Sequence, residues 1–285
     1  MMIKTKLGID KILTINLPKR KDRRKSFNDK FQTMEFDFVD AVDGSKLDTK
    51  KLIKSGKISE THFDPQGSTS KYVIGCSLSH LLAWETFNKS KDETCLIFED
   101  DVYNTKKLVQ VTTDLDTNGI VVNPSQLWND IWSEIQELEW DVIYLGKKQQ
   151  YVNGEDVTNH FCKPFWGAGM FGAHSYLINK KSVKKLIKRY KPIQYAVDVF
   201  LDLMIEDMNV FALKESLFRQ DTDIYLHDRV NIDKVDSDTF HNNEFKLTKV
   251  QVDDTVESVD FINYPNSAEY TNKRWPPLIR LNLRK

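Results

Sequence analysis

The chain has 285 residues, of which 40% are hydrophobic and 29% are charged, and its formal net charge is -1. This composition excludes a disordered chain and a membrane protein, and the small net charge disfavours nucleic acid as the main partner. Neither a membrane span nor the apolar core of a signal peptide is visible in the sequence, so we expect a cytoplasmic protein without a transmembrane segment. The three cysteines have unrelated spacings, which predicts buried thiols rather than disulfides or a zinc site.

The first predicted strand, Lys11–Leu17, is a short apolar run. Pro18 and a basic stretch follow it, and this order is typical of a strand, a loop and a helix. Arg20, Arg23 and Arg24 would then lie at the mouth of a sheet, where guanidinium groups can pair with a diphosphate. A solvated basic helix face is the alternative.

Residues 35–44 predict a strand that runs into a turn, and residues 45–71 predict a long loop or a short helical piece near the site. Gly75 marks the expected start of an amphipathic helix. Its first turn would offer free N–H groups and small hydroxyls such as that of Ser79 to an anionic or polyhydroxyl ligand. His80 lies in the same turn and is either catalytic or simply packed and hydrogen-bonded.

The stretch Cys95–Asp101, CLIFEDD, ends an apolar run in three carboxylates. Apolar runs without polar alternation are typical of central strands of parallel sheets. Ligands of open α/β sheets bind outside the carboxyl ends of the strands, so Glu99, Asp100 and Asp101 should face the ligand together. Crowded carboxylates are tolerated mainly when a hard cation such as Mg²⁺ or Mn²⁺ neutralises them. A solvated acidic turn is the alternative reading.

Residues 102–124 look polar and irregular, and the acidic triplet at 114–116 is interpreted as an exposed loop because no predicted strand precedes it. Beyond it, strands alternate with helices, which predicts an α/β fold. The expected elements are a helix capped by Ser125, strands at 140–146 and near 167–179, a helix from Ser182, a helix with Asp198 and Asp202 on one face, and a last strand at 209–215. A second acidic triplet, at 221–223, is also interpreted as a loop.

Six segments, in this order, resemble glycosyltransferase family 25: INLPKRKDRR, AVDG, GCSLSHLLAW, IFEDD, WDVIYLGKK and AVDVFL. The family includes bacterial lipooligosaccharide galactosyltransferases and animal procollagen galactosyltransferases, and the last two segments are closer to the collagen-modifying branch. The resemblance implies a GT-A type fold with a central, mostly parallel sheet flanked by helices. It also implies a UDP-linked sugar donor, a divalent metal and inversion at the anomeric carbon. Residues 1–230 would form this domain, and residues 231–285 a C-terminal extension of unknown role packed on it.

The resemblance and the chemistry of the residues together assign roles to individual side chains. Glu99 and Asp101 are the expected metal ligands, with His227 as an additional ligand or else a surface residue. Asp198 is the expected general base on the acceptor hydroxyl, with His80 next in line; a helix-capping aspartate is the alternative for Asp198. The expected contacts to the nucleotide sugar are Asn16, Arg20, Arg23, Asp43, Ser79 and Asp100.

The predicted function is metal-dependent, inverting transfer of galactose or glucose from a UDP-sugar, with Mn²⁺ or Mg²⁺ as the cofactor. The acceptor would be a hydroxyl group of a collagen-like protein, at hydroxylysine, or of a glycan. An inactive sugar-nucleotide-binding module and a metal-dependent phosphotransferase remain open, although no Walker-type glycine loop supports the latter. The lack of a signal peptide and of an ER-retention ending favours a bacterial or viral setting. No oligomeric state is predicted.

Overall fold

The computed structural model describes residues 7–63, 70–114, 119–148, 152, 154–165, 170 and 172–220. Several sequence predictions lie outside these residues, namely the role of His227, the acidic triplet at 221–223, the domain boundary at residue 230 and the C-terminal extension.

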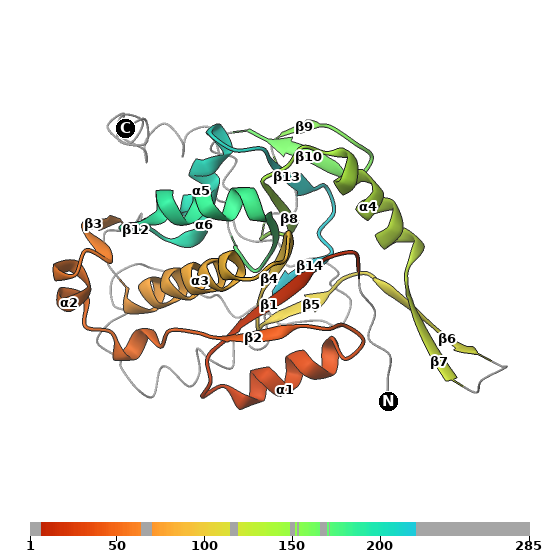
Figure 1. The fold of residues 1–285 in the computed structure, drawn as a ribbon, viewed down its shortest axis with the longest axis horizontal. Helices are drawn as coiled ribbons and strands as arrows, with labels where there is room; N and C mark the ends of the chain where they lie inside the picture. The colour runs from red at the N-terminus through yellow and green to blue at the C-terminus, as the bar shows by residue number, and fades with distance from the viewer. Residues whose placement is uncertain are drawn as a thin grey trace, which may run out of the picture. The chain divides into compact units, whose positions relative to one another are not determined.

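An eight-stranded sheet forms the centre of the described part, with the strand order β2-β1-β4-β11-β8-β13-β10-β9 (Figure 1). The strands β2, β1 and β4 are parallel to one another, as are β8 and β13, whereas β10 and β11 run antiparallel to their neighbours. The bounds are β1 (Lys11–Asn16), β2 (Asp37–Asp40), β4 (Thr94–Glu99), β8 (Val142–Gly146), β9 (Gly154–Asp156), β10 (Phe161–Pro164), β11 (Ser175–Asn179) and β13 (Val210–Leu213). The predicted α/β fold with a central, mostly parallel sheet is confirmed, but one neighbour of β4, the strand β11, is antiparallel to it.

Helices cover both faces of this sheet because successive residues of the central strands point to opposite faces and are apolar on both. One face packs against α1 (Lys21–Lys30) and α4 (Gln126–Glu137) in a core that contains Phe27, Phe98, Trp128 and Leu177. The other face carries α3 (Lys71–Lys89), α5 (Lys180–Tyr190) and α6 (Val197–Leu203), which lie together in Figure 1.

Aromatic side chains join the three helices of the second face. The ring of Trp84 on α3 lies 5.2 Å from that of Tyr190 on α5 and 6.1 Å from that of Phe200 on α6, centroid to centroid. The rings of Tyr190 and Phe200 are themselves 4.4 Å apart. Large buried rings contribute more apolar area than any other side chains, so this cluster fixes the position of α3 behind the sheet.

Two predicted helix starts are confirmed. The Oγ of Ser125 accepts a hydrogen bond from the backbone N–H of Trp128, at 3.2 Å, and so caps α4. The helix α5 begins shortly before Ser182, because Asn179 is its N-cap and Ser182 completes a capping box with it.

The predicted start of α3 at Gly75 is wrong. The helix begins at Lys71 after Ser70, so Gly75 lies in its second turn and the free N–H groups expected beside Ser79 are absent there. A Cβ atom at Gly75 would lie 2.9 Å from backbone atoms of both Gly44 and Val42. Glycine is therefore needed for the close approach of α3 to this backbone, and it does not mark the start of a helix.

Residues 102–124 are not irregular, contrary to the sequence prediction. They contain β5 (Val102–Asn104), which pairs with β14 (Phe218–Gln220), and the hairpin of β6 (Val109–Asp114) and β7 (Gly119–Pro124). The hairpin projects away from the central sheet (Figure 1). Asp114, the first residue of the acidic triplet, therefore ends the strand β6, while residues 115 and 116 lie outside the described residues. The strand at 210–213 is not the last, because β14 follows it.

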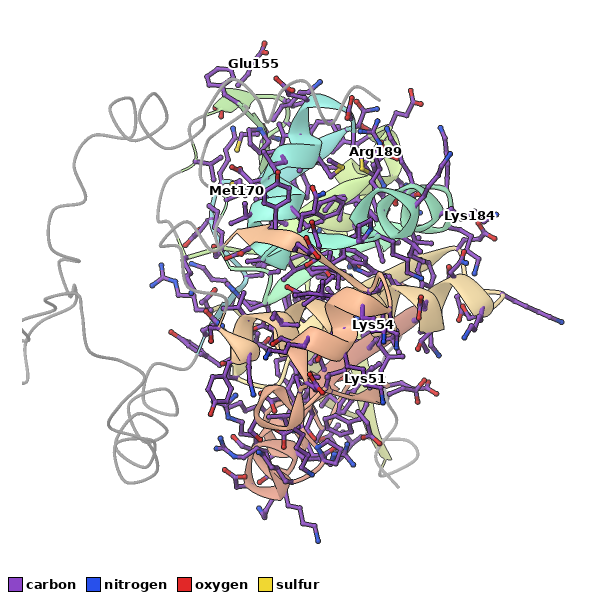
Figure 2. All side chains as sticks on the ribbon, turned by 90° about the vertical axis from the view of Figure 1, so that its left-hand side faces the viewer. Lys51, Lys54, Glu155, Met170, Lys184 and Arg189 are labelled. Atoms are coloured by element: carbon purple, nitrogen blue, oxygen red, sulfur yellow. The ribbon has the colours of Figure 1, made fainter. Side chains whose placement is uncertain are left out.

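Other short elements were also missed. The segment 45–71 contains α2 (Thr49–Lys54) and β3 (Ile58–Phe63), which pairs with β12 (Ile193–Tyr195), and single 3₁₀ turns occur at η1 (Gly44–Lys46) and η2 (Met204–Glu206). Figure 2 shows Glu155 and Lys184 at the periphery. None of the helices in the described part combines the length and the apolar character needed to cross a bilayer.

The three cysteines are free thiols, as predicted. Cys95 and Cys162 are buried, but the prediction that all three are buried is wrong for Cys76, which is exposed. Cys76 lies on α3 one turn before His80. Its place beside the acidic residues is described below.

Candidate active site

The acidic residues after β4 lie at the carboxyl edge of the sheet, beside the end of β1. Ile15 of β1 pairs with Glu99 of β4, so Asn16 at the end of β1 comes next to the turn that follows Glu99. Asp100 and Asp101 in this turn are buried, with 7% and 6% of their surface exposed. The alternative of a solvated acidic turn is therefore excluded by burial.

Asp100 is held by two of the side chains predicted to act with it. The Nδ2 of Asn16 donates to its Oδ2 at 2.7 Å, and Nη1 of Arg23 donates to its Oδ1 at 2.8 Å. The Nε of Arg24 in turn donates to Oδ1 of Asn16 at 3.0 Å. Burial raises the pKa of Asp100, although the charge and hydrogen bonds of Arg23 and Asn16 act against this.

Asp101 has weaker support. Its Oδ2 lies 3.6 Å from Nη1 of Arg23, while its Oδ1 is buried and has no hydrogen-bond partner among the residues that the structure describes. Burial, followed by the negative charge of Glu99, raises the pKa of Asp101 to about 7. A buried carboxylate oxygen without a donor is costly, so this atom is an acceptor that a ligand can satisfy.

This donor set fits a hard divalent cation. Glu99, Asp100 and Asp101 supply only oxygen ligands from one short segment, as Mg²⁺ and Mn²⁺ prefer. Asp100 is engaged by Asn16 and Arg23, so Asp101 and the partly exposed Glu99 are the residues that would hold such an ion.

Glu99 is oriented by two donors from distant parts of the chain. Its Oε1 lies 3.2 Å from Nε2 of His80, and its Oε2 accepts from Nε2 of Gln220 at 3.0 Å. Burial alone would raise the pKa of Glu99, but the hydrogen bond from His80, together with the positive charge of Lys148, outweighs it and holds this pKa below its ordinary value. The pKa values of Glu99 and Asp101 are therefore shifted in opposite directions.

His80 is fully buried behind Glu99. Its Nδ1 lies 2.8 Å from the hydroxyl of Tyr176, which also accepts a hydrogen bond from Nε1 of Trp84 at 2.8 Å. His80 is therefore a packed, hydrogen-bonded residue, and its ring is not exposed to solvent, from which an acceptor would approach.

The carboxylate of Asp198 accepts hydrogen bonds from two backbone N–H groups. Its Oδ1 accepts from the N–H of Val199 at 2.9 Å and its Oδ2 from the N–H of Gly172 at 3.3 Å. Asp202, four residues later on α6, accepts from the N–H of Met170 at 3.1 Å, and Met170 (labelled in Figure 2) is buried. The predicted common face of Asp198 and Asp202 is confirmed, and both carboxylates bind one short segment of backbone.

The thiol of Cys76 lies beside the acidic turn, because its Sγ is within 4.8 Å of ligand atoms of His80 and Glu99. Cys76 has solvent-exposed surface, yet dense protein surroundings and then the charges of Glu99, Asp198 and Asp101 raise the pKa of its thiol. The charges of carboxylates from β4, the following turn and α6 thus act on this one side chain.

Three residues that were predicted to contact the nucleotide form hydrogen bonds or ion pairs with other residues of the protein. Arg20 pairs with Asp22 at 2.7 Å, and Asp43 pairs with Lys19 at 2.8 Å. The bonds from Lys19 and Ser45 lower the pKa of Asp43 to about 2. The Oγ of Ser79 donates to the carbonyl of Gly75 at 2.6 Å and accepts from the N–H of Val42 at 2.9 Å. Their roles toward a nucleotide stay predictions.

Sequence reasoning missed three residues of the site, which are Lys148, His174 and Gln220. The charge of Lys148 lowers the pKa of both Glu99 and Cys76, and His174 is buried with its carbonyl accepting from the N–H of Glu99 at 3.0 Å. Burial lowers the pKa of His174. Lys148 follows β8, whose carboxyl end lies at the same edge as that of β4, so the argument applied to Arg20 and Arg23 would also have found it.

The fold and the site define an α/β protein with a buried acidic site at the carboxyl edge of its sheet. The chain belongs to glycosyltransferase family 25, because the sequence profile described as "Glycosyltransferase family 25 (LPS biosynthesis protein)" matches residues 9–201. The family predicted from six sequence segments is thereby confirmed, and all six lie wholly within the matched residues.

Among the relatives is procollagen galactosyltransferase 2 of Mus musculus, 32% identical over 229 residues that cover 74% of this chain and 32% of that protein. Another is the inactive glycosyltransferase 25 family member 3 of Homo sapiens, 29% identical over 209 residues that cover 71% of this chain and 33% of that protein. The chain thus spans about a third of the length of the curated relatives it matches. A solved glycosyltransferase involved in the glycosylation of the major capsid of PBCV-1 is 10% identical, with a TM-score of 0.35 over 77% of this chain and 98% of that one.

Proposed function

We propose that this chain is a metal-dependent, inverting glycosyltransferase that moves galactose or glucose from a UDP-sugar to a hydroxyl group. The observation that carries the proposal is the Oδ1 of Asp101, which is buried and has no hydrogen-bond partner within the described part of the chain, in a turn with two further carboxylates. Such an arrangement is costly in the absence of a ligand and becomes favourable when a cation binds.

Glu99 and Asp101 would hold the cation, while the bonds from Asn16 and Arg23 to Asp100 keep the turn in place. A divalent cation bound there supplies positive charge to the leaving diphosphate without any proton transfer. Arg23, which pairs with Asp100, and Lys148, whose charge acts on Glu99, would add positive charge for the diphosphate. Together these groups favour departure of UDP.

Asp198 would act as the general base. Inversion takes one displacement, so the proton of the acceptor hydroxyl must be removed on the face of the sugar opposite the diphosphate. Asp198 comes from α6, on another element than the acidic turn, and the N–H groups of Val199 and Gly172 fix the direction of its carboxylate. A base held in one orientation can accept the proton as the new glycosidic bond forms.

Two acceptor classes suit the family. The similarity to procollagen galactosyltransferase 2 supports hydroxylysine in a collagen-like peptide, and the family description, which names LPS biosynthesis, supports a glycan. We place the peptide acceptor first because of the 32% identity to that relative.

A sugar-nucleotide-binding module without activity is the second candidate, since an inactive family member is 29% identical to this chain. The chain would be incubated with UDP-galactose or UDP-glucose, Mn²⁺ and each acceptor, with an EDTA-treated control. Metal-dependent release of UDP together with a glycosylated product supports the transferase. Binding of the UDP-sugar without release supports the module, and transfer of phosphate instead of sugar would indicate a phosphotransferase.

A further inference from the structure

Four side chains from three elements form a continuous hydrogen-bonded line that ends on Glu99. Nε1 of Trp84 donates to the hydroxyl of Tyr176 at 2.8 Å, that hydroxyl lies 2.8 Å from Nδ1 of His80, and Nε2 of His80 lies 3.2 Å from Oε1 of Glu99. Trp84 and His80 are one turn apart on α3, and Tyr176 belongs to β11. Trp84, Tyr176 and His80 are fully buried.

The positions of the protons along this line follow from its two ends. The indole of Trp84 can only donate, and an ionised carboxylate at Glu99 can only accept. The hydroxyl of Tyr176 therefore accepts from Trp84 and gives its own proton to Nδ1 of His80. A neutral imidazole that accepts at Nδ1 carries its proton on Nε2, which is the nitrogen that faces Glu99.

We propose that His80 is a positioning residue, which Tyr176 and Trp84 hold as the Nε2–H tautomer so that it orients the carboxylate of Glu99. The assignment of Glu99 as a cation ligand rests on the proposed function. Partners behind metal ligands act in this way, because they fix the direction of the ligating oxygen before the ion binds. The rigid elements that carry the line, α3 and the central strand β11, suit this role.

Another reading of the same atoms is weaker. Ligand atoms of Cys76, His80 and Glu99 lie within 4.8 Å of one another, as in a mixed metal site. To bind a metal through Nε2, a neutral His80 would carry its proton on Nδ1 and direct it at the Tyr176 hydroxyl. That hydroxyl would then need another acceptor for its own proton, and its recorded bonds in the described part go only to His80 and Trp84.

The proton assignment can be tested on the full, metal-free chain without any activity. Long-range ¹H–¹⁵N NMR distinguishes the two histidine tautomers, and His80→Gln identifies the signals of His80 among the 6 histidines. The expected result is the Nε2–H form alone in the wild type, and a mixture of tautomers in Tyr176→Phe, which lacks the donor to Nδ1. An Nδ1–H form, or a doubly protonated ring, in the wild type at neutral pH would overturn the proposal.

The positioning role is tested by Mn²⁺ binding in the presence of UDP, measured by electron paramagnetic resonance of the free ion. His80→Leu removes the donor to Glu99 and should weaken Mn²⁺ binding about 10–100-fold, whereas His80→Gln can present an N–H and should retain most of it. Tyr176→Phe should fall between them; because it leaves the buried Nε1–H of Trp84 without its acceptor, it should also lower the melting temperature, and Mn²⁺ binding is compared where all variants are folded. Equal affinity in the Leu and Gln variants would refute a positioning role. A wild type that binds no Mn²⁺ refutes the metal function of Glu99, while the NMR result still decides the tautomer.

Discussion

The acidic turn after β4 and the pair of aspartates on α6 contain the same functional group in opposite situations. In the turn, side chains donate hydrogen bonds to the carboxylates, and one buried oxygen of Asp101 has no partner among the described residues. On α6, Asp198 and Asp202 accept from backbone N–H groups of residues 170, 172 and 199. The carboxylates of the turn have fewer donors than they can accept from, whereas those of α6 hold backbone N–H groups in place.

The difference indicates a division of labour. A carboxylate group that is under-supplied with donors gains most from a cation, whereas one that holds backbone N–H groups gains most from staying in place. Substitutions in the turn should therefore change ligand binding with little effect on the fold. On α6, a substitution at Asp198 should lower the rate of transfer, whereas a substitution at Asp202 should lower the free energy of unfolding.

The largest effect is expected for Asp101→Asn. This change removes the charge that we assign to the cation, and loss of several kcal/mol of charge stabilisation lowers transfer on the order of 10²–10³-fold or to background. Metal-dependent thermal stabilisation by UDP should vanish as well. Turnover of UDP-sugar and melting curves with and without Mn²⁺ measure both quantities.

The control is Asp114→Asn, at the end of the projecting strand β6, which should have almost no effect. Full activity in Asp101→Asn would contradict the cation role and would leave the turn as a purely structural feature.

The aspartates of α6 provide the second test. Asp198→Asn should lower transfer by about 10²–10⁴-fold at saturating donor, as expected when a general base is lost, while UDP and metal affinity stay nearly unchanged. Asp202→Asn, the matched control, weakens the bond to the N–H of Met170 and should cost about 1–3 kcal/mol of unfolding free energy. Transfer rates and chemical denaturation are measured on both variants.

If Asp198→Asn lowers the melting temperature and every function in proportion, Asp198 is a helix cap and a backbone anchor only. Transfer at the wild-type rate would remove it from the mechanism.

A smaller effect is expected at Arg23. Its guanidinium bridges Asp100 and Asp101, so Arg23→Ala should weaken UDP binding by about 1–3 kcal/mol if a charge-assisted bond to the diphosphate is lost. Lys25→Ala, whose partner Asp29 is exposed, is the control. Calorimetry with UDP and Mn²⁺ decides, and an unchanged affinity would confine Arg23 to holding the turn.

The sequence was sufficient to predict the residues of the site that lie at the ends of strands. The apolar run before Glu99 and the order of strands and helices were sufficient to place the acidic turn at the carboxyl edge of the sheet, with Asn16 and Arg23 beside it. Apolar periodicity is strong in long buried elements, which explains why these predictions are correct.

The remaining features depend on contacts that sequence spacing does not encode. Gly75 was taken for a helix start, whereas its lack of a side chain serves the approach of α3 to Gly44, 31 positions away in the numbering. Tyr176 and Gln220 reach His80 and Glu99 only through the sheet pairing of distant strands. The strands β5 to β7 are short and include many polar residues, and the sequence analysis interpreted them as irregular.

The smallest effect concerns pH and the metal-free protein. The pKa of Asp101 rises from the ordinary 3.8 to about 7 on folding. Between these values the folded chain keeps a proton that the unfolded chain has lost, so the contribution of Asp101 to the unfolding free energy falls as the pH rises and is constant above about 7. Asp101→Asn has no such proton. In EDTA, it should therefore gain stability relative to the wild type across this window, as measured by urea denaturation. Mn²⁺ should reverse the trend for the wild type alone, because the ion replaces the proton. Parallel curves for the two proteins in EDTA would show that the carboxylate of Asp101 ionises normally, and the contrast between the turn and α6 would then lose its electrostatic basis.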